Sequence, residues 1–286
     1  MVARNSHQER TLTMPHQKDL LLAEGKTKRI WSSSLTNKHV IIESKDDLTA
    51  GDGAKHDIIP GKGALSNQTI CNVFECLKAW GLPVAFFRQY SATEFIAEHC
   101  AMIPYEVVVR RLAFGSILKR YPSYDKGYVF PELLPEFFLK TSGKKWQGYG
   151  LPVDDPLIIF SQNRGCLFRP DQPIGQQAPF LILDDFPLQH SPKEIKDIDQ
   201  IAIRAFLEVE IAWRKLGYRL VDFKLEFGHN VDGELRLADV IDNDSWRLLD
   251  EHGYDVSKQA YREGEPLEKV AANYRLVAQR TELFCI

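Results

Sequence analysis

The strongest limit on the fold of this chain comes from residues 221–227, which read VDFKLEF and alternate strictly between apolar and charged side chains. Successive side chains of a β-strand point to opposite faces of a sheet, so this pattern predicts a half-buried strand. Its core face would carry Val221, Phe223, Leu225 and Phe227, and its other face would carry Asp222, Lys224 and Glu226.

A second strand is expected directly after this one. Asp232-Gly233 predicts a turn and Glu234–Ile241 a returning strand, so the unit reads as an antiparallel hairpin. Asp239 shares a face with Lys224 and Glu226 only if the connection holds an even number of residues or a bulge shifts the register. A four-residue loop would set Asp222 opposite Asp239, and a six-residue loop would set Lys224 there.

In either register two carboxylates, Glu226 and Asp239, converge beside a lysine. Mg²⁺ usually takes one or two carboxylates and fills its other positions with phosphate oxygens and water, so the group suits a magnesium–nucleotide site. The alternative is a solvated sheet face, a common meaning of alternating charge. The polar run Asp242–Arg247, which follows the strand end, favours a site.

Composition sets wider bounds. With 286 residues and 44% hydrophobic content, the chain can form one large domain or two lobes around a substantial core. A net charge of −3 gives no global attraction for nucleic acid or for a membrane surface, and no apolar run is long enough to span a bilayer. Residues 1–18 are polar and lack the apolar core of a signal peptide, so we expect a disordered tail on a cytoplasmic protein.

The five cysteines show no Cys-x-x-Cys motif and no Cys/His ligand spacing, which argues against a zinc site. An odd number of cysteines without such spacing predicts reduced, buried thiols, consistent with the cytosol. They are Cys71, Cys76, Cys100, Cys166 and Cys285.

The N-terminal part reads as an antiparallel sheet that begins with strands at Leu20–Trp31 and Val40–Ser44. Lys26 and Lys28 would share a strand face behind Gly25, which lets a phosphate approach the backbone. The spacing is not that of a Walker A loop, and lysines that guard a solvated sheet edge are the alternative interpretation.

Residues 46–62 are rich in glycine and charge and predict a loop, followed by a helix at Ala64–Trp80. Strands are expected at Val84–Gln89 and Glu106–Arg110. The second strand leads to Ser116 at the start of a short helix. A helix-start serine beside the arginine fork of Arg110 suits a phosphate or carboxylate, although a plain helix cap with a surface arginine is the alternative.

The rest of the chain alternates between irregular and helical segments. Between residues 122 and 190 proline and glycine recur, which predicts loops with short strands, including a hairpin at Leu157–Phe168. Ser191-Pro192-Lys193-Glu194 is a capping box that opens a helix to Leu216. A last helix is predicted at Pro266–Phe284, after a charged connector at Asp250–Glu265.

The two segments VDFKLEFG and LADVIDNDSWRL resemble the signature of phosphoribosylaminoimidazole-succinocarboxamide synthases, the SAICAR synthetase family, in wording closest to the animal form. Further matches occur in the family's order at Gly25–Lys28, Thr49–Ala54 and Val108–Ser116. Because the resemblance extends from Leu20 to Phe284, a chance match to one short motif is a poor explanation.

This resemblance implies an α+β fold with two lobes. An N-terminal antiparallel lobe at about residues 19–105 would resemble a kinase small lobe, residues 106–286 would hold substrate and metal, and ATP would occupy an ATP-grasp-like cleft. The implied reaction joins L-aspartate to carboxyaminoimidazole ribonucleotide (CAIR) and yields SAICAR, ADP and phosphate in purine biosynthesis. The implied partners are these small molecules, with Mg²⁺ as cofactor, and homo-oligomerisation is left open.

Residue roles follow from the resemblance position by position. Lys26 and Lys28 would bind the ATP phosphates, Glu226 and Asp239 would bind magnesium, and Lys224 would act on the transferring phosphoryl group with Asp222 beside it. The substrate contacts would be Asp52, Arg110, Ser116, Lys140, Asp244 and Arg247. Many bacterial members carry glutamate where this chain has Val240.

Two rival functions share these features. A small-molecule kinase of related fold would use the same lysines and carboxylates without an aspartate pocket. A nucleotide-binding regulatory module would need no catalytic carboxylates, and the presence of both Glu226 and Asp239 argues against it.

Overall fold

The computed structural model describes residues 17–161, 164–183 and 191–285, without the side chain of Asp52. Residues 1–16 of the predicted tail lie outside this part of the chain. Lys18, the last residue of the predicted tail, is the first residue of a strand. No described helix is both long and apolar enough to cross a bilayer.

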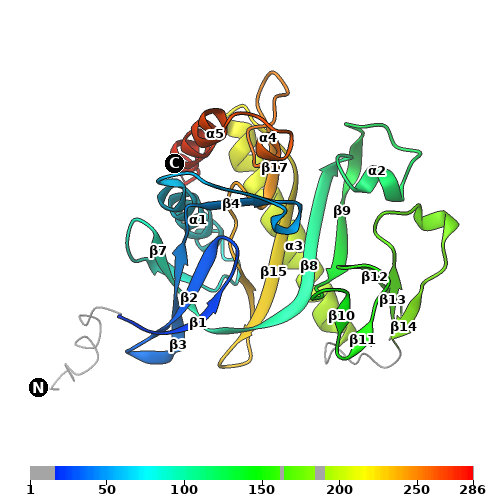
Figure 1. The fold of residues 1–286 in the computed structure, drawn as a ribbon, viewed down its shortest axis with the longest axis horizontal. Coiled ribbons are helices and arrows are strands. Elements are labelled where there is room, and N and C mark those ends of the chain that lie inside the picture. Colours follow the sequence, from blue (N-terminus) through cyan, green and yellow to red (C-terminus); the bar gives the residue numbers. More distant parts are fainter. Residues whose placement is uncertain (1–16, 162–163, 184–190, 286) are drawn as a thin grey trace, which may run out of the picture.

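The first sheet has five antiparallel strands in the order β1-β2-β3-β7-β6, and α1 packs against it (Figure 1). Its elements are β1 (Lys18–Glu24), β2 (Lys28–Ser33), β3 (Thr36–Ser44), β6 (Phe86–Gln89), β7 (Glu94–Glu98) and α1 (Lys62–Ala79). The prediction of one continuous strand at Leu20–Trp31 is wrong. The chain turns at residues 25–27, where the Gly25 N–H donates to the Lys28 carbonyl at 2.9 Å. Lys26 therefore lies in a turn.

The second sheet has eight strands in the order β14-β13-β12-β9-β8-β15-β16, with β17 paired to β15. The helix α3 (Pro192–Lys215) packs across β15, β8 and β9 (Figure 1). The strands are β8 (Cys100–Leu112), β9 (Val129–Leu139), β12 (Leu157–Ser161), β13 (Arg164–Phe168), β14 (Leu181–Leu183), β15 (Arg219–Asn230), β16 (Leu235–Ala238) and β17 (Trp246–Leu249). The backbone of Ala85 joins the two sheets by donating to Leu237 at 2.9 Å.

Smaller elements surround the sheets. The predicted loop at residues 46–62 contains a short hairpin, and the predicted connector at Asp250–Glu265 contains a short helix. The remaining elements are β4 (Asp47–Ala50), η1 (Gly51–Gly53), β5 (Lys55–Ile58), α2 (Ile117–Arg120), β10 (Lys145–Trp146), β11 (Tyr149–Gly150), η2 (Ile174–Gln176), α4 (Gln259–Arg262) and α5 (Leu267–Thr281).

Two sequence signals hold in detail. The Ser191 side chain accepts from the Glu194 backbone N–H at 3.2 Å, with Pro192 in the first turn, so Ser191 caps the start of α3 as predicted. The Glu194 side chain pairs with His229 of β15. The apolar residues of the alternating stretch are buried in β15, and Phe223 meets Phe206 of α3 edge-on with ring centroids 5.2 Å apart. This contact fixes which face of β15 is core.

The strand β9 was missed because Pro131 and Pro135 interrupt its sequence. Proline lacks the N–H of a sheet ladder and usually argues against an interior strand. Here β9 nevertheless pairs with both β8 and β12, with Pro135 opposite Val109. The predicted hairpin is confirmed, with Leu157 opposite Phe168.

The prediction that all five cysteines are reduced is wrong. Cys76 of α1 and Cys285 lie 209 positions apart in sequence and form a disulfide, with their Cα atoms 5.7 Å apart. The side-by-side packing of α1 and α5 creates this proximity. The thiols of Cys71, Cys100 and Cys166 are free, and burial raises the pKa of Cys71 to about 12.

Candidate active site

The hairpin of β15 and β16 brings two carboxylates together by a route that register alone does not supply. Glu226 lies opposite Ala238, so neither of the two predicted registers occurs, and strict alternation would turn Asp239 to the other face. However, β16 ends at Ala238, and Asp239 adopts a left-handed backbone with φ of 50°. Asp239 reaches the same cavity as Glu226 by leaving the strand.

A cluster of alternating charge surrounds these carboxylates. The Lys224 Nζ lies 3.2 Å from both Glu106 Oε2 and Glu226 Oε1. Lys140 also ion-pairs with Glu226. Glu106 stands opposite Glu226 across the β8–β15 pair, so adjacent strands fix the spacing.

The charges shift each other's protonation. Burial and the neighbouring Glu226 raise the pKa of Asp239 to about 6. Burial lowers the pKa of Lys224, but Glu106, Glu226 and Asp239 outweigh it and raise this pKa above its usual value. The lysine is therefore a cation at neutral pH, and Asp239 is the group that is hardest to ionise.

A second cluster lies where β8, β15 and β17 meet. Asp222 stands opposite both Arg110 and Arg247 in sheet register, and its carboxylate pairs with both guanidinium groups. Arg110 Nη1 donates to Asp222 at 2.6 Å and its Nε donates to Glu136 at 2.6 Å. Asp222, predicted as catalytic, thus holds two arginines in place.

Ser116 and Gly115 border this cluster. The Ser116 hydroxyl is 3.5 Å from Arg110 Nη2. Gly115 has φ of 66°, and a Cβ there would lie 2.5 Å from Arg247 Nη2. Only glycine therefore lets the guanidinium of Arg247 lie so close to the backbone.

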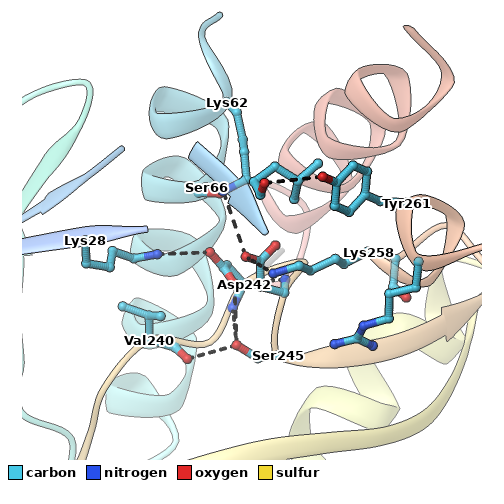
Figure 2. A network of polar contacts seen from close by, with 12 residues as sticks. Lys28, Lys62, Ser66, Val240, Asp242, Ser245, Lys258 and Tyr261 are labelled. Atoms are coloured by element: carbon cyan, nitrogen blue, oxygen red, sulfur yellow. Dashed lines mark hydrogen bonds and ion pairs between the residues drawn. The ribbon is translucent and has the colours of Figure 1, made fainter. Parts of the chain in front are cut away.

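A third cluster forms on the polar run after β16 (Figure 2). Lys28 Nζ lies 3.4 Å from Asp242 Oδ2, and the Asp244 N–H donates to Asp242 Oδ1 at 2.9 Å. Lys258 donates to Asp244 Oδ2 at 3.0 Å, and the fully buried Lys62 lies 3.9 Å from the same oxygen.

Asp244 is bonded at both of its carboxylate oxygens. The Tyr274 hydroxyl of α5 donates to its other oxygen. Burial would raise the pKa of Asp244, but Lys62, Lys258 and Lys28 outweigh it and hold this pKa well below its usual value. Burial lowers the pKa of Lys62, which the carboxylates of Asp244 and Asp242 oppose.

Members of all three clusters line one polar cavity of about 510 Å³. A second, mostly apolar cavity of about 390 Å³ adjoins it, because Lys28, Asp239 and Val240 line both. The apolar cavity is enclosed by side chains of both sheets and of α1, including Ile30, Val40, Ile42, Phe74, Phe86, Phe95 and Leu237.

Most residues singled out from the sequence meet at these cavities. The polar cavity is lined by Lys26, Lys28, Arg110, Ser116, Asp222, Lys224, Asp239, Asp244 and Arg247, and the apolar cavity by Lys28, Lys140, Glu226 and Asp239. Asp52 lies in η1, but its side chain is outside the described part of the structure.

Sequence reasoning missed several lining groups. Glu106 shares a strand face with Arg110 by period two, so its signal was available. Lys258 and Arg262 are four residues apart and line the polar cavity, but the segment had been read as a connector. The apolar cavity has no motif, because separate strands contribute single side chains.

The carboxylate pair fits a magnesium ion. Asp239 and Glu226 line the same cavity, and burial together with the charge of Glu226 raises the pKa of Asp239, an effect that a bound divalent cation would oppose. In the described ranges no group of three or more His, Cys, Asp or Glu side chains forms a metal centre. The remaining ligands would therefore be phosphate oxygens and water, as Mg²⁺ commonly takes.

Comparison with known proteins decides the family. The SAICAR synthetase profile matches residues 21–147 and 175–281. The chain belongs to the SAICAR synthetase family. The phosphoribosylaminoimidazole-succinocarboxamide synthase of Chloroflexus aggregans is 37% identical over 91% of this chain and 95% of its own length. A probable multifunctional protein of Caenorhabditis elegans is 37% identical over 92% of this chain, which spans 58% of that longer protein.

Solved SAICAR synthetases share the fold. The Ehrlichia chaffeensis enzyme superposes with a TM-score of 0.72 at 26% identity, covering 92% of this chain and 99% of its own. A SAICAR synthetase solved with ADP gives 0.70 at 29% identity, covering 91% and 96%. The predicted family, the α+β fold and the assignment to the ATP-dependent, SAICAR-forming ligases are confirmed, and the kinase alternative is not favoured.

Proposed function

We propose that this member of the SAICAR synthetase family joins CAIR and L-aspartate in the polar cavity, with ATP held across the boundary between the two cavities. The supporting observation is their contact at Lys28 and Asp239. An apolar slot for a base thus opens onto cations and carboxylates suited to phosphates.

The nucleotide would enter with its purine in the apolar cavity. At about 390 Å³ and walled by aliphatic and aromatic side chains, this cavity suits a flat base. The triphosphate would extend past Lys28 and Lys26 towards Lys224. Mg²⁺ held by Glu226 and Asp239 would supply neutralisation of phosphate charge. One relative was solved in complex with ADP, which is consistent with this use of ATP.

The ribotide would bind at the arginine end. Arg247 and Ser116 offer donors to its phosphate. Arg110 pairs with Glu136 through Nε and with Asp222 through Nη1, so its Nη2, which lies beside Ser116, is the nitrogen it would contribute. Asp244 would accept from the sugar or base, and Lys140 and Asp52 complete the proposed substrate contacts. A pre-formed, charge-paired donor set lowers the ordering cost of binding.

The chemistry then needs positioning more than a protein nucleophile. A carboxylate oxygen of CAIR attacks the γ-phosphorus, the bond to the ADP oxygen breaks, and an acyl phosphate forms. The aspartate amine attacks the acyl carbon, phosphate leaves with its bonding electrons, and the amine loses a proton. Lys224 stabilises charge on the transferring phosphoryl group, and the carboxylate network keeps this lysine cationic.

An assay of ADP release with each substrate omitted in turn tests this proposal. ADP should form at full rate only when CAIR, aspartate, ATP and Mg²⁺ are all present. Sustained multiple-turnover ADP release without aspartate, with a stable phosphorylated ribotide as product, would contradict the ligase function and favour a kinase.

We also propose a cytoplasmic location, where ATP is abundant. Cell fractionation tests this proposal.

A further inference from the structure

The C-terminal end of the described chain is fastened to α1 at three successive turns of that helix. Residues 68, 72 and 76 are each four apart, so their side chains lie on one face of α1. Two of the contacts are hydrogen bonds and the third is covalent. The pairs are Gln68 with Glu282, Asn72 with Thr281, and Cys76 with Cys285.

The same C-terminal turn also packs on α3. Phe284 is buried, and its ring meets that of Trp213 edge-on with centroids 4.8 Å apart. Hydrogen bonds and aromatic packing therefore hold the turn in place without the disulfide. The covalent bond strengthens an arrangement that weaker contacts already define.

Both of the fastened helices reach the polar cavity. The helices α1 and α5 lie side by side (Figure 1). Lys62 of α1 lies 3.9 Å from one oxygen of Asp244, and the Tyr274 hydroxyl of α5 donates to the other oxygen. The packing of α5 on α1 thus determines how this carboxylate is supported from both sides.

The two bonded cysteines differ in their access to solvent. Cys76 is 2% exposed, whereas Cys285 is an exposed residue, so a reductant can approach the bond from the Cys285 side. Thiol–disulfide exchange requires such access. Cys71 lies five residues before Cys76 on the same helix, but burial raises the pKa of its thiol to about 12. Because the thiolate is the attacking species, Cys71 does not exchange with the pair.

We infer that Cys76 and Cys285 form a redox-sensitive latch, which ties α5 to α1 when oxidised and leaves it held by weaker contacts alone when a dithiol reductant opens the bond. A thiolate of the reductant attacks the Cys285 sulfur, the S–S bond breaks, and the Cys76 sulfur leaves with the bonding electrons and takes a proton. The second thiol of the reductant then attacks the mixed disulfide. This step frees the Cys285 thiol and oxidises the reductant to its own disulfide.

The direction of the response follows from the chemistry of the compartment. Cytosolic thiol systems keep most cysteines reduced, so an accessible pair of this kind is open under ordinary cytosolic conditions and closes under oxidation. The closed latch then stabilises the fold, because it ties together residues 209 positions apart and restricts the unfolded chain.

Comparison of the oxidised and reduced forms of the unmodified protein tests the latch. After treatment with glutathione disulfide, N-ethylmaleimide should label three thiols in the denatured protein, and after dithiothreitol without denaturant it should label all five. Reduction should lower the thermal unfolding midpoint by about 5–15 °C. Amide hydrogen exchange should become faster in α5, where the covalent tie is lost.

Two serine variants separate the latch from a general effect of the reductant. Cys285→Ser, at an exposed position, should match the reduced protein and show no further change with dithiothreitol. Cys166→Ser is the matched control, because Cys166 is a free cysteine of β13, and it should keep the full response.

Equal unfolding midpoints for the oxidised and reduced protein would overturn the inference. So would a bond that opens only in denaturant, or a Cys285→Ser protein that still responds to dithiothreitol. None of these measurements uses the ligase reaction, so a failure of the proposed ligase function would leave the latch standing, and the reverse also holds.

Discussion

The two ends of the polar cavity use buried charge in opposite ways. At the arginine end, Asp222 and Glu136 are each shared between two arginines, with contacts of 2.6–2.7 Å between Glu136 and its partners. At the carboxylate end, burial and the charge of Glu226 raise the pKa of Asp239 to about 6. The first end is satisfied by the protein alone. At the second end, the ionised form of Asp239 is disfavoured in the protein alone and would be favoured by a bound cation. The comparison indicates that one end of the cavity serves stability and the other serves binding.

The largest effect should come from removing the shared carboxylate at the arginine end. Glu136→Gln leaves Arg110 and Arg120 without their shared carboxylate, so the free energy of unfolding should fall by about 3–5 kcal/mol, as for a buried pair that loses one partner. Urea denaturation measures this. Glu132→Gln, at an exposed position of the same strand, is the control and should change little. A loss below about 1 kcal/mol would show that the arginine end does not depend on this pair.

Breaking the carboxylate end should instead affect turnover. Asp239→Asn removes one charge and little volume, so kcat should fall about 100-fold, while the unfolding midpoint stays level or rises. Steady-state kinetics at saturating Mg²⁺ and calorimetry measure the two quantities. Asp232→Asn, in the exposed turn of the same hairpin, should alter neither. An unchanged rate would remove Asp239 from the proposed metal site.

The pH dependence of stability should carry opposite signs at the two ends. The pKa of Asp239 is higher in the folded than in the unfolded protein, so ionisation of Asp239 lowers the free energy of unfolding of the ligand-free protein. This loss is absent below about pH 4 and is complete above about pH 6. The stability advantage of Asp239→Asn should therefore grow between these pH values, to about 1–2 kcal/mol. Burial raises the pKa of Glu136, but its arginines lower it further, so its stabilisation is lost on acidification. Unfolding titrations from pH 4 to 7 would refute this if the Asp239→Asn advantage stayed constant.

The smallest expected effect concerns Arg247 at the arginine end. Arg247→Lys keeps the charge but loses the planar fork that lies against Gly115, so KM for CAIR should rise by about threefold to tenfold, with KM for ATP unchanged. Arg214→Lys on an exposed face of α3 is the matched control. A rise in the ATP value alone would place Arg247 on the nucleotide.

Local patterns predicted the parts of the fold that depend on local chemistry. The alternation at residues 221–227 fixed β15 and its core face, and Ser191 with Glu194 fixed the start of α3. These signals work because neighbours along the chain make the deciding contacts.

The rest depends on contacts between distant segments. No local sequence pattern predicts the left-handed backbone of Asp239. The pairing of Cys76 with Cys285 follows from the packing of α1 on α5. Lys62 and Tyr274 become part of the site only because both reach Asp244. Residues of this kind carry no motif, since their meaning lies in the tertiary structure.

The attachment of the β4–β5 hairpin to Tyr261 has a consequence for folding kinetics. Lys55 donates to the Tyr261 carbonyl 206 positions later, and Asp57 accepts from the Tyr261 hydroxyl 204 positions later. By contrast, β1 pairs with β2 across a tight turn. Closing such long loops costs entropy before any contact repays it, so these pairings should form late. After dilution from denaturant, helix and sheet signals should return first, and ligase activity should follow as a slower phase limited by assembly of the cavity wall.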